Sequence, residues 1–195
     1  MNQKKIGLIA LILGAIIALT FYFGYNSFVK LDEEVKVKWA EIQNTYQRRN
    51  DLIPSLVAVV KGSTDFEKTT LQQIAEARSK VGQVSVTGID YNGFEQQEAA
   101  QANLTNNLNR VIAVVENYPD LQSTKEFATL QTQLEGTERR IKFARKDFNE
   151  AIRAYNSKAR SFPWNMVGIV LGFKPKDGFK ADAGAENVPE VKFSK

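Results

Sequence analysis

The residues with most scope for chemistry form one short polar run, Arg48-Arg49-Asn50-Asp51, inside an otherwise apolar helical pattern. Arg49 falls on or near the apolar side of that pattern, where an unpaired charge is expensive to bury. We therefore expect it to pair with an acid on a later helix, such as Glu98, Glu116 or Glu135. One interpretation is a buried polar layer at a binding site. The favoured one is structural: an ion pair that sets helix register, or an arginine whose head group reaches solvent.

The chain lacks the residue types on which many enzymatic sites depend, because it has no Cys and no His. Their absence removes thiol and imidazole nucleophiles, imidazole bases, disulfides and the usual zinc ligands. Paired carboxylates can still act as acid and base or hold a metal in a bundle core, but the Glu-x-x-His pattern of di-iron bundles needs His. We predict no enzymatic activity, no catalytic, cofactor-binding or metal-binding residue, and no cofactor.

The 195-residue chain carries a net charge of +4, and three of its lysines flank one apolar segment. Without Lys4, Lys5 and Lys30, 23 basic residues stand against 22 acidic ones, so the remainder is close to neutral. A nucleic-acid-binding domain normally carries a concentrated basic surplus in its folded part. We therefore expect no nucleic acid partner.

Residues Ile6–Val29 contain no charged side chain. As a helix rising ~1.5 Å per residue they span ~36 Å, more than the ~30 Å hydrocarbon core of a bilayer. Aromatic residues gather near the far end, where such side chains favour the headgroup boundary. The alternative is a cleaved signal peptide, with Ala15 and Ala18 as a small-residue site, but the apolar run is long for a signal core. We predict a retained, single-pass signal anchor that exports the folded part.

The segment from Phe28 to Lys61 reads as one long amphipathic helix, because its apolar residues recur every three or four positions. Pro54 lies within this pattern, and its missing N–H and its ring predict a kink or a short break. The apolar stripe consists of Phe28, Leu31, Val35, Trp39, Ile42, Tyr46, Ile53, Leu56 and Val60.

Three later segments carry matching stripes, at about residues 65–81, 94–118 and 124–160. The second of them has the alternating three-four spacing of coiled-coil packing. The connection at residues 82–93 contains glycines and is expected to be non-helical. The three start signals are Thr64 with Glu67, Asn92 with Glu95, and the run Ser123–Glu126. The predicted fold is all-α, an antiparallel four-helix bundle preceded by one N-terminal transmembrane helix.

The chain is expected to have three parts: an N-terminal membrane anchor at residues 1–29, a long-helix bundle at 30–160, and an apolar segment with an irregular tail at 161–195. Phe162–Phe173 is apolar but about half the length that crosses a bilayer. An antiparallel bundle places this segment at the membrane-proximal end. Trp164 and its neighbours then either touch the headgroup region or fold back over an apolar groove on the bundle.

Six motifs follow one another in the order Tyr25–Leu31, Trp39–Gln43, Arg48–Val57, Ala75–Arg78, Tyr155–Asn156 and Phe162–Pro163. With the preceding anchor, this order resembles the LemA family of bacterial membrane proteins. The resemblance covers nearly the whole chain, and the Arg48–Val57 stretch is its most specific part. It implies a single-pass protein of the bacterial cell membrane with a four-helix bundle, and it implies no catalytic residue.

These observations predict a membrane-anchored interaction or scaffold protein without catalytic activity. Its expected partners are the lipid bilayer, through the N-terminal helix, and another membrane or envelope protein. The bundle is expected on the extracytoplasmic side. The alternative is a sensor of a small ligand or of envelope state that uses a polar layer in the bundle. The candidate structural or interaction positions are Arg48, Arg49, Asp51, Pro54 and Trp164.

Overall fold

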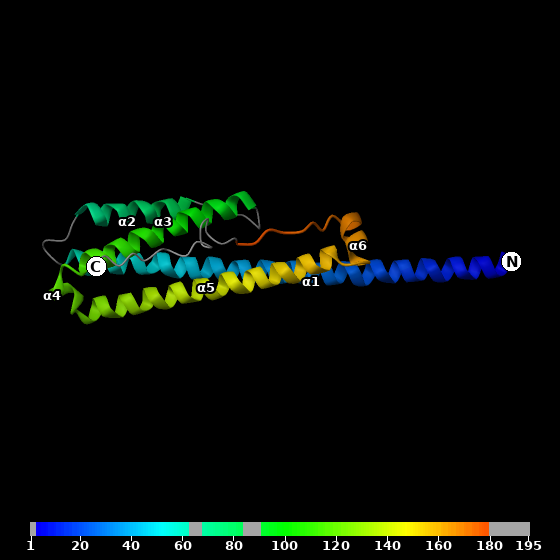
Figure 1. Cartoon of the computed structure of the whole chain (residues 1–195), viewed down its shortest axis with the longest axis horizontal. Coiled ribbons are helices and arrows are strands. Elements are labelled where there is room, and N and C mark those ends of the chain that lie inside the picture. The colour runs from blue at the N-terminus through cyan, green and yellow to red at the C-terminus, as the bar shows by residue number, and fades with distance from the viewer. Residues whose placement is uncertain (1–2, 63–67, 84–90, 180–195) are drawn as a thin grey trace, which may run out of the picture.

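In the computed structural model a single helix, α1 (Gln3–Lys61), runs along the long axis of the molecule (Figure 1). The structure describes residues 3–62, 68–83 and 91–179, with side chains from residue 95 onward in the last range. The first part of α1 projects beyond the other helices with exposed apolar side chains, and it is long and apolar enough to cross a membrane. The expected boundary at residue 29 lies inside this unbroken helix, and the three-part division of the chain stays a prediction.

Helix α1 continues through Pro54, so the short break that the sequence allows there does not occur. Pro54 itself is exposed, whereas Ile53 and Leu56 on either side of it are buried. Packing of an apolar face contributes most of the stability of a helix in a protein. The buried neighbours therefore hold the helix together across the missing hydrogen bond.

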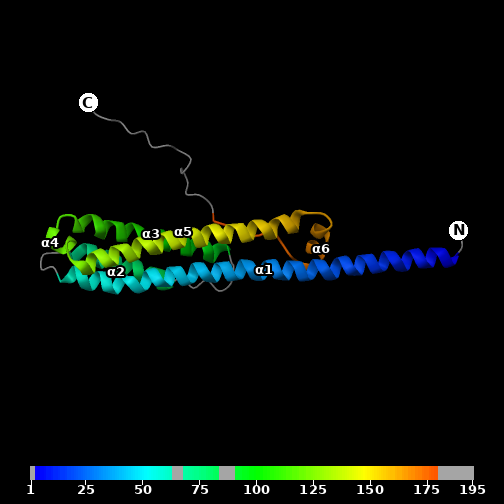
Figure 2. The same cartoon turned by 90° about the horizontal axis from the view of Figure 1, so that it is seen from below.

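The other helices complete a bundle around the half of α1 that is distal to the N-terminus. They are α2 (Lys68–Gln83), α3 (Tyr91–Val115), the short α4 (Pro119–Gln122) and the long α5 (Lys125–Arg160). Helix α5 runs antiparallel to α1, and α2 with α3 forms a hairpin over the distal part (Figures 1 and 2). The described residues contain no strand. The predicted all-α antiparallel bundle behind one long apolar N-terminal helix is confirmed.

The predicted apolar stripes are the buried faces of the helices. On α1 every predicted position is buried except Leu31, which is half-buried. The stripe predicted for α5 is buried at all nine of its positions, which are Phe127, Leu130, Leu134, Thr137, Ile141, Ala144, Phe148, Ile152 and Tyr155. The stripe predicted for α2 is buried at its four described positions, which are Thr70, Ile74, Ala77 and Val81. On α3 the buried residues are Gln101, Leu104, Leu108, Val111 and Val115. Periodicity alone therefore identifies which side of each helix faces inward.

The buried residues form two separate cores. The distal core lies where four long helices meet, and it is almost entirely aliphatic; it contains Ile53, Leu56, Val60, Ile74, Ala77, Val81, Leu104, Leu108, Val111, Val115, Leu121, Phe127 and Leu134. The proximal core lies nearer the projecting end of α1, and it is rich in aromatic rings; it contains Phe28, Val35, Trp39, Ile42, Tyr46, Ile141, Ala144, Phe148, Ala151, Ile152, Tyr155 and Val167.

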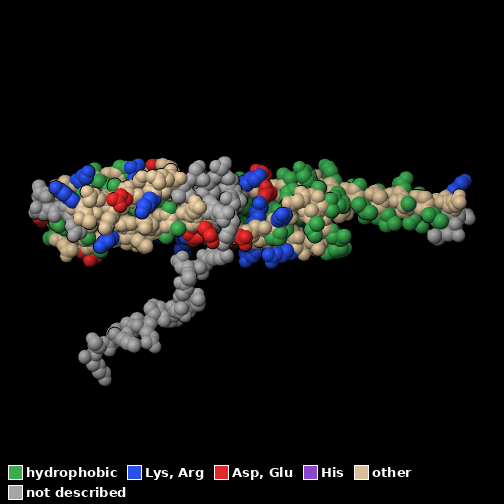
Figure 3. Space-filling view, turned by 90° about the horizontal axis from the view of Figure 1, so that it is seen from above, with side chains coloured by type: hydrophobic (Ala, Val, Ile, Leu, Met, Phe, Trp, Pro, Cys, Tyr) green, Lys and Arg blue, Asp and Glu red, His purple; other side chains and the backbone are tan. Residues whose placement is uncertain are grey.

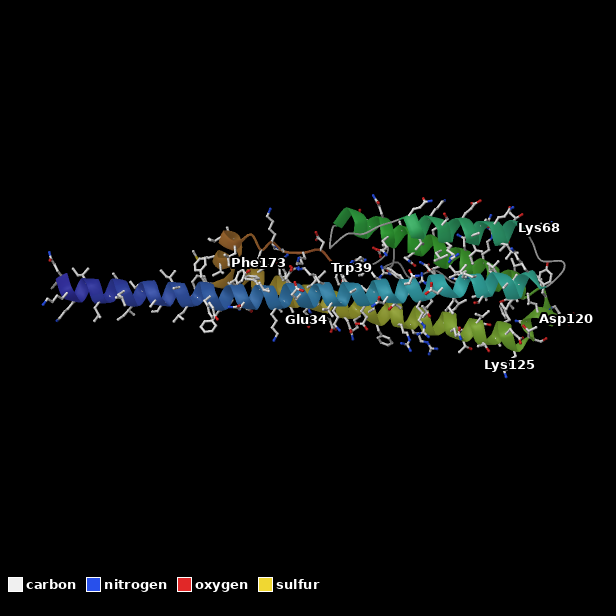
Figure 4. All side chains as sticks on the ribbon, turned by 180° about the vertical axis from the view of Figure 1, so that it is seen from behind. Glu34, Trp39, Lys68, Asp120, Lys125 and Phe173 are labelled. Carbon is white, nitrogen blue, oxygen red and sulfur yellow. The ribbon has the colours of Figure 1, made fainter. Side chains whose placement is uncertain are left out.

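The starts of α3 and α5 lie within one residue of the expected start signals, but not at the residues that the signals name. The Thr124 hydroxyl accepts a hydrogen bond from the Phe127 N–H at 3.3 Å, so the cap before α5 is Thr124, one residue after the Ser123 of the expected capping box. Thr64 and Glu67 lie outside the described residues. Helix α3 begins at Tyr91, one residue before the expected cap. Helix α3 ends at Val115, three residues before the expected end at residue 118, and Pro119 is the first residue of α4. Figure 4 shows Lys68, Asp120 and Lys125 together at the distal end.

The C-terminal segment folds back onto the bundle. The Phe162–Pro163 peptide bond is cis, and the eight-residue helix α6 (Trp164–Leu171) follows it. Residues 173–179, which we call the strap, then run without helix or strand alongside α1 and α5, from Phe173 toward Trp39 (Figure 4). The irregular tail expected at the C-terminus stays a prediction. The remainder of the expected tail, residues 180–195, lies outside the described residues.

Candidate functional site

The strongest polar constellation is the one around Arg49, at the junction of the two cores. The Arg49 side chain is only 3% exposed, and its Nη2 contacts the two carboxylate oxygens of Glu138 at 2.7 and 2.8 Å. Its Nη1 donates to the Gln101 side-chain oxygen at 3.0 Å and to the Thr105 hydroxyl at 2.8 Å. Three helices, α1, α3 and α5, therefore meet at one guanidinium. We call Arg49, Gln101, Thr105 and Glu138 the polar layer.

The expected ion pair exists, but its acid is none of the three that sequence reasoning named. Glu138 supplies the carboxylate, whereas Glu98 pairs with Arg145 nearby. The choice depends on how far α5 is displaced along α1. Stripe positions give the phase of each helix but not its axial offset, so they do not identify the acid.

Burial dominates the electrostatics of the layer. It lowers the pKa of Arg49, while the charge and hydrogen bonding of Glu138 act in the opposite sense. Burial also raises the pKa of Tyr46, whose ring lies 5.8 Å from the Arg49 guanidinium carbon. An arginine keeps its charge at neutral pH under such shifts. The layer therefore holds a permanent buried cation, compensated by one half-exposed carboxylate.

The polar layer opens on a pocket of about 250 Å³, lined among others by Tyr46, Glu98 and Arg145. Two buried donors of the layer, Arg49 Nε and Gln101 Nε2, have no hydrogen-bond partner among the described residues. A buried donor without a partner costs about 1–3 kcal/mol, so water or a small polar ligand would be stabilised there. The arrangement can bind a hydrogen-bond acceptor, but it positions no nucleophile.

The other predicted positions on α1 lie outside the polar layer. Arg48 and Asp51 are exposed, and Asp51 accepts a hydrogen bond from the Gln47 amide at 2.8 Å. Pro54 lines a groove of about 510 Å³ between α1 and α2. Arg78 lines the other side of the same groove. The lining of the groove thus comes from two stretches that lie far apart in the sequence, around Pro54 and around Arg78. Arg49 is not part of this lining.

Trp164, the fifth predicted position, lies at the opposite end of the bundle. It is half-buried at the start of α6, and the Lys158 ammonium lies 3.5 Å from its ring centroid. A lysine over a Trp face is a favourable cation–π contact. The predicted positions therefore do not form one site: Arg49 lies in the polar layer, Pro54 in the α1–α2 groove and Trp164 in α6. Arg48 and Asp51 are exposed on α1 outside all three.

Sequence reasoning missed the residues that hold the strap. The Asn149 side chain donates to the Phe179 carbonyl at 3.1 Å and accepts from its N–H at 2.8 Å. The Asn156 side chain does the same for Lys176, at 2.7 and 2.8 Å. These two asparagines, which we call the amide clamps, are seven residues apart and so share one face of α5. The seven-residue spacing is the one signal of the amide clamps in the sequence. The neighbouring residues do not indicate which groups the two amides bind.

No cluster suited to a metal ion is present in the part of the chain that the structure describes. A family model described as the LemA family matches residues 38–193. The chain belongs to the LemA family. The resemblance found from the motifs is thereby confirmed, and the family match includes both the polar layer and the strap.

This LemA-family chain is also similar to several named proteins. Magnetosome protein MamQ 2 of Paramagnetospirillum magneticum is 27% identical over 180 residues, which cover 83% of this chain and 66% of that protein. Magnetosome protein MamQ of Magnetospirillum gryphiswaldense is 26% identical over 179 residues, covering 82% and 66%. Protein LemA of Metamycoplasma hominis is 24% identical over 159 residues, covering 77% and 68%. The chain spans just under two thirds of the length of the MamQ proteins, and none of these names describes an enzyme.

Proposed function

We propose that this chain is a scaffold without catalytic activity, held in a bacterial cell membrane by one pass of α1. The observation that carries the proposal is the continuity of α1. Its exposed apolar part and its buried bundle part belong to one 59-residue helix. Because a helix transmits position along its whole length, the anchor fixes the height and tilt of the bundle. Such coupling suits a module that presents a surface at a fixed distance from the bilayer.

The partner of the scaffold is another membrane or envelope protein, and the bundle lies on the extracytoplasmic side. The short N-terminus before the apolar segment carries Lys4 and Lys5, as in a signal anchor. Magnetosome and LemA relatives support a place at a membrane. We assign the α1–α2 groove as the partner-facing surface, because its lining combines apolar Ile53, Pro54 and Val57 with Arg78 at the rim.

Anchoring is tested by carbonate extraction of the untagged chain from bacterial membranes, followed by the mass of its N-terminus. The expected result is a membrane-bound chain that keeps Ile6–Val29. A soluble product that begins after Ala18 or Thr20 would contradict the anchor.

The partner surface is tested by photocrosslinking in intact cells. A photoreactive residue at Arg78 is expected to yield one discrete membrane-protein adduct. The same residue at Thr132, which is exposed on α5, is the matched control and is expected to yield none. Equal labelling from both positions would show that the groove is not the contact surface.

A second candidate function, sensing of a small ligand, is favoured by the unpartnered donors Arg49 Nε and Gln101 Nε2 beside the 250 Å³ pocket. Arg49→Met separates the two candidates. If the layer is structural, the variant changes in thermal stability but keeps its membrane location and its adduct at Arg78. Loss of the adduct in a variant that melts like the parent would make the polar layer a site.

A further inference from the structure

We propose that α6 is a second membrane contact, and that its outer face lies in the headgroup region of the leaflet where the membrane pass of α1 ends. The inference rests on the anchoring proposed above. It concerns a surface that the scaffold proposal leaves unused, and its occupant is the lipid bilayer itself.

Helix α6 has one face against the protein and one face without cover among the described residues. Within α6, Val167 and Gly168 form the inner face and are buried. On the outer side Ile169 is 80% exposed and Val170 is 68% exposed. Phe162, just before the helix, is 79% exposed. A short, almost wholly apolar helix that leaves such side chains uncovered is unusual on a soluble surface.

The level of α6 along α1 is fixed by close packing at Gly24. A Cβ atom at Gly24 would lie 2.9 Å from Val167 Cγ1 and 3.1 Å from the Trp164 ring, so only glycine admits this approach. On the other side, the Phe28 ring stacks on Phe173 with centroids 4.8 Å apart. Helix α6 therefore sits against the turn of α1 between Gly24 and Phe28.

That turn coincides with the expected edge of the hydrocarbon. From Ile6 to Gly24 a helix at ~1.5 Å per residue covers ~28 Å, close to the ~30 Å hydrocarbon core. The charge-free segment Ile6–Val29 is longer than the core by about one helical turn, and α6 packs on that extra turn. The outer face of α6 is thereby placed at headgroup depth rather than in bulk water.

The surroundings of α6 have the charge distribution of an interfacial segment. Lys30, Arg160 and Lys174 are exposed near it, and the Lys158 ammonium covers the Trp164 ring at 3.5 Å. Interfacial helices combine an apolar face containing Trp with basic residues that contact lipid phosphates. Figure 3 shows apolar side chains gathered where the bundle meets the projecting part of α1, and they are continuous with the apolar side chains of that part. This continuity favours lipid over a separate protein partner.

Depth measurement by spin labels tests the proposal directly, because the chain has no cysteine to remove. The full chain is reconstituted in vesicles of phosphatidylethanolamine and phosphatidylglycerol, with one nitroxide per molecule. The label at Ile169→Cys is expected to collide more with oxygen than with a water-soluble nickel complex. Val37→Cys, which lies 62% exposed on the bundle, is the water control, and Leu13→Cys in the apolar part of α1 is the lipid control.

The possible results separate this inference from the anchoring on which it rests. If Leu13→Cys reads as lipid and Ile169→Cys reads as water, the anchor stands and the α6 contact is wrong. If Leu13→Cys reads as water, anchoring itself fails and this inference fails with it. Shielding of Ile169→Cys from both reagents would identify a protein occupant and overturn the lipid assignment.

A second pair of variants tests whether packing at Gly24 sets the depth. Gly24→Leu in the Ile169→Cys background is expected to displace α6 and change the oxygen-to-nickel ratio severalfold. Gly14→Leu is the matched control, since a Cβ at Gly14 meets nothing within 4 Å. An unchanged ratio in Gly24→Leu would show that this contact does not position α6.

Discussion

The distal and proximal cores differ in the elements that enclose them and in the side chains that fill them. In the distal core four long helices surround the interior, and the described buried side chains there are aliphatic except for Phe127. In the proximal core only α1 and α5 are long, and the interior is filled by rings such as Phe28, Trp39 and Phe148. Two packed helices cannot enclose a core by themselves, because a groove stays open on either side of the line where they touch.

The proximal core is closed by larger side chains and by the C-terminal segment. Phe173 stacks on Phe28, and Phe179 lies 6.3 Å from Trp39 and 5.6 Å from Phe148 between ring centroids. The strap thus takes the place that the α2–α3 hairpin has in the distal core. The polar layer therefore marks the position along α1 where enclosure by the α2–α3 hairpin gives way to enclosure by the strap.

The largest effect is expected when a charge is placed inside either core. Leu108→Asp in the distal core and Phe148→Asp in the proximal core should each lower the free energy of unfolding by about 3–5 kcal/mol, since each places a carboxylate at a buried, apolar position. Circular dichroism melts of the full chain in detergent measure it. Unchanged melting temperatures for both variants would show that the two cores are wrongly assigned.

A chain that ends at Arg160 should weaken the proximal core while leaving the distal core folded. It loses Val167, Phe173 and Phe179, and burial of one large apolar side chain contributes about 1.5–3 kcal/mol. Because Phe173 and Phe179 are only partly buried, we expect a loss of about 3 kcal/mol, below the sum for three fully buried side chains. Hydrogen exchange reads this loss as faster exchange in residues 28–46 and 141–155. Equal loss of protection in α2 and α3 would mean that the two cores form one cooperative unit.

Removal of one amide clamp should have a smaller effect, confined to the strap. Asn149→Ala breaks two hydrogen bonds to Phe179, and a net loss of about 1–2 kcal/mol follows. Asn44→Ala, exposed on α1, is the control and should stay within about 0.5 kcal/mol of the parent. Urea unfolding measures both. A clamp variant as stable as the control would remove the strap from the energetics of the proximal core.

The smallest effect concerns pH. Burial acts to raise the pKa of Asp32, but the hydrogen bonds and charges of Lys176 and Lys36 outweigh it and the pKa is lowered. The carboxylate form therefore stabilises the folded state above its ordinary pKa of 3.8, and this contribution is lost as pH falls through the lowered value. Because the pair is partly solvated, less than about 1 kcal/mol is expected.

The control for this pH effect is Asp32→Asn, which should flatten that part of the stability profile when parent and variant are unfolded by urea between pH 6 and pH 2. Parallel curves for the two proteins would show that the contact of Asp32 with the strap residue Lys176 is energetically silent.

Much of the bundle was predictable because its information is local. The inward stripe of α5, from Phe127 to Tyr155, follows from a period of 3.6 residues, and the run Ser123–Glu126 indicates a helix start, although Thr124 rather than Ser123 is the cap. The burial of Arg49 also followed from its place on a stripe. Its partner Glu138 did not, since one turn of sliding between α1 and α5 would exchange it for another acid.

The sequence therefore predicts the four main helical segments, their inward faces, the exposed apolar segment and the need for a partner at Arg49, but not the short helices α4 and α6. The axial offset between the helices follows from the tertiary structure alone. That offset brings Glu138 to Arg49, Asn149 and Asn156 to the backbone of the strap, and Val167 to Gly24. The physical reason is that periodicity fixes rotation about a helix axis, whereas translation along it is set by the sum of contacts between segments distant in the chain.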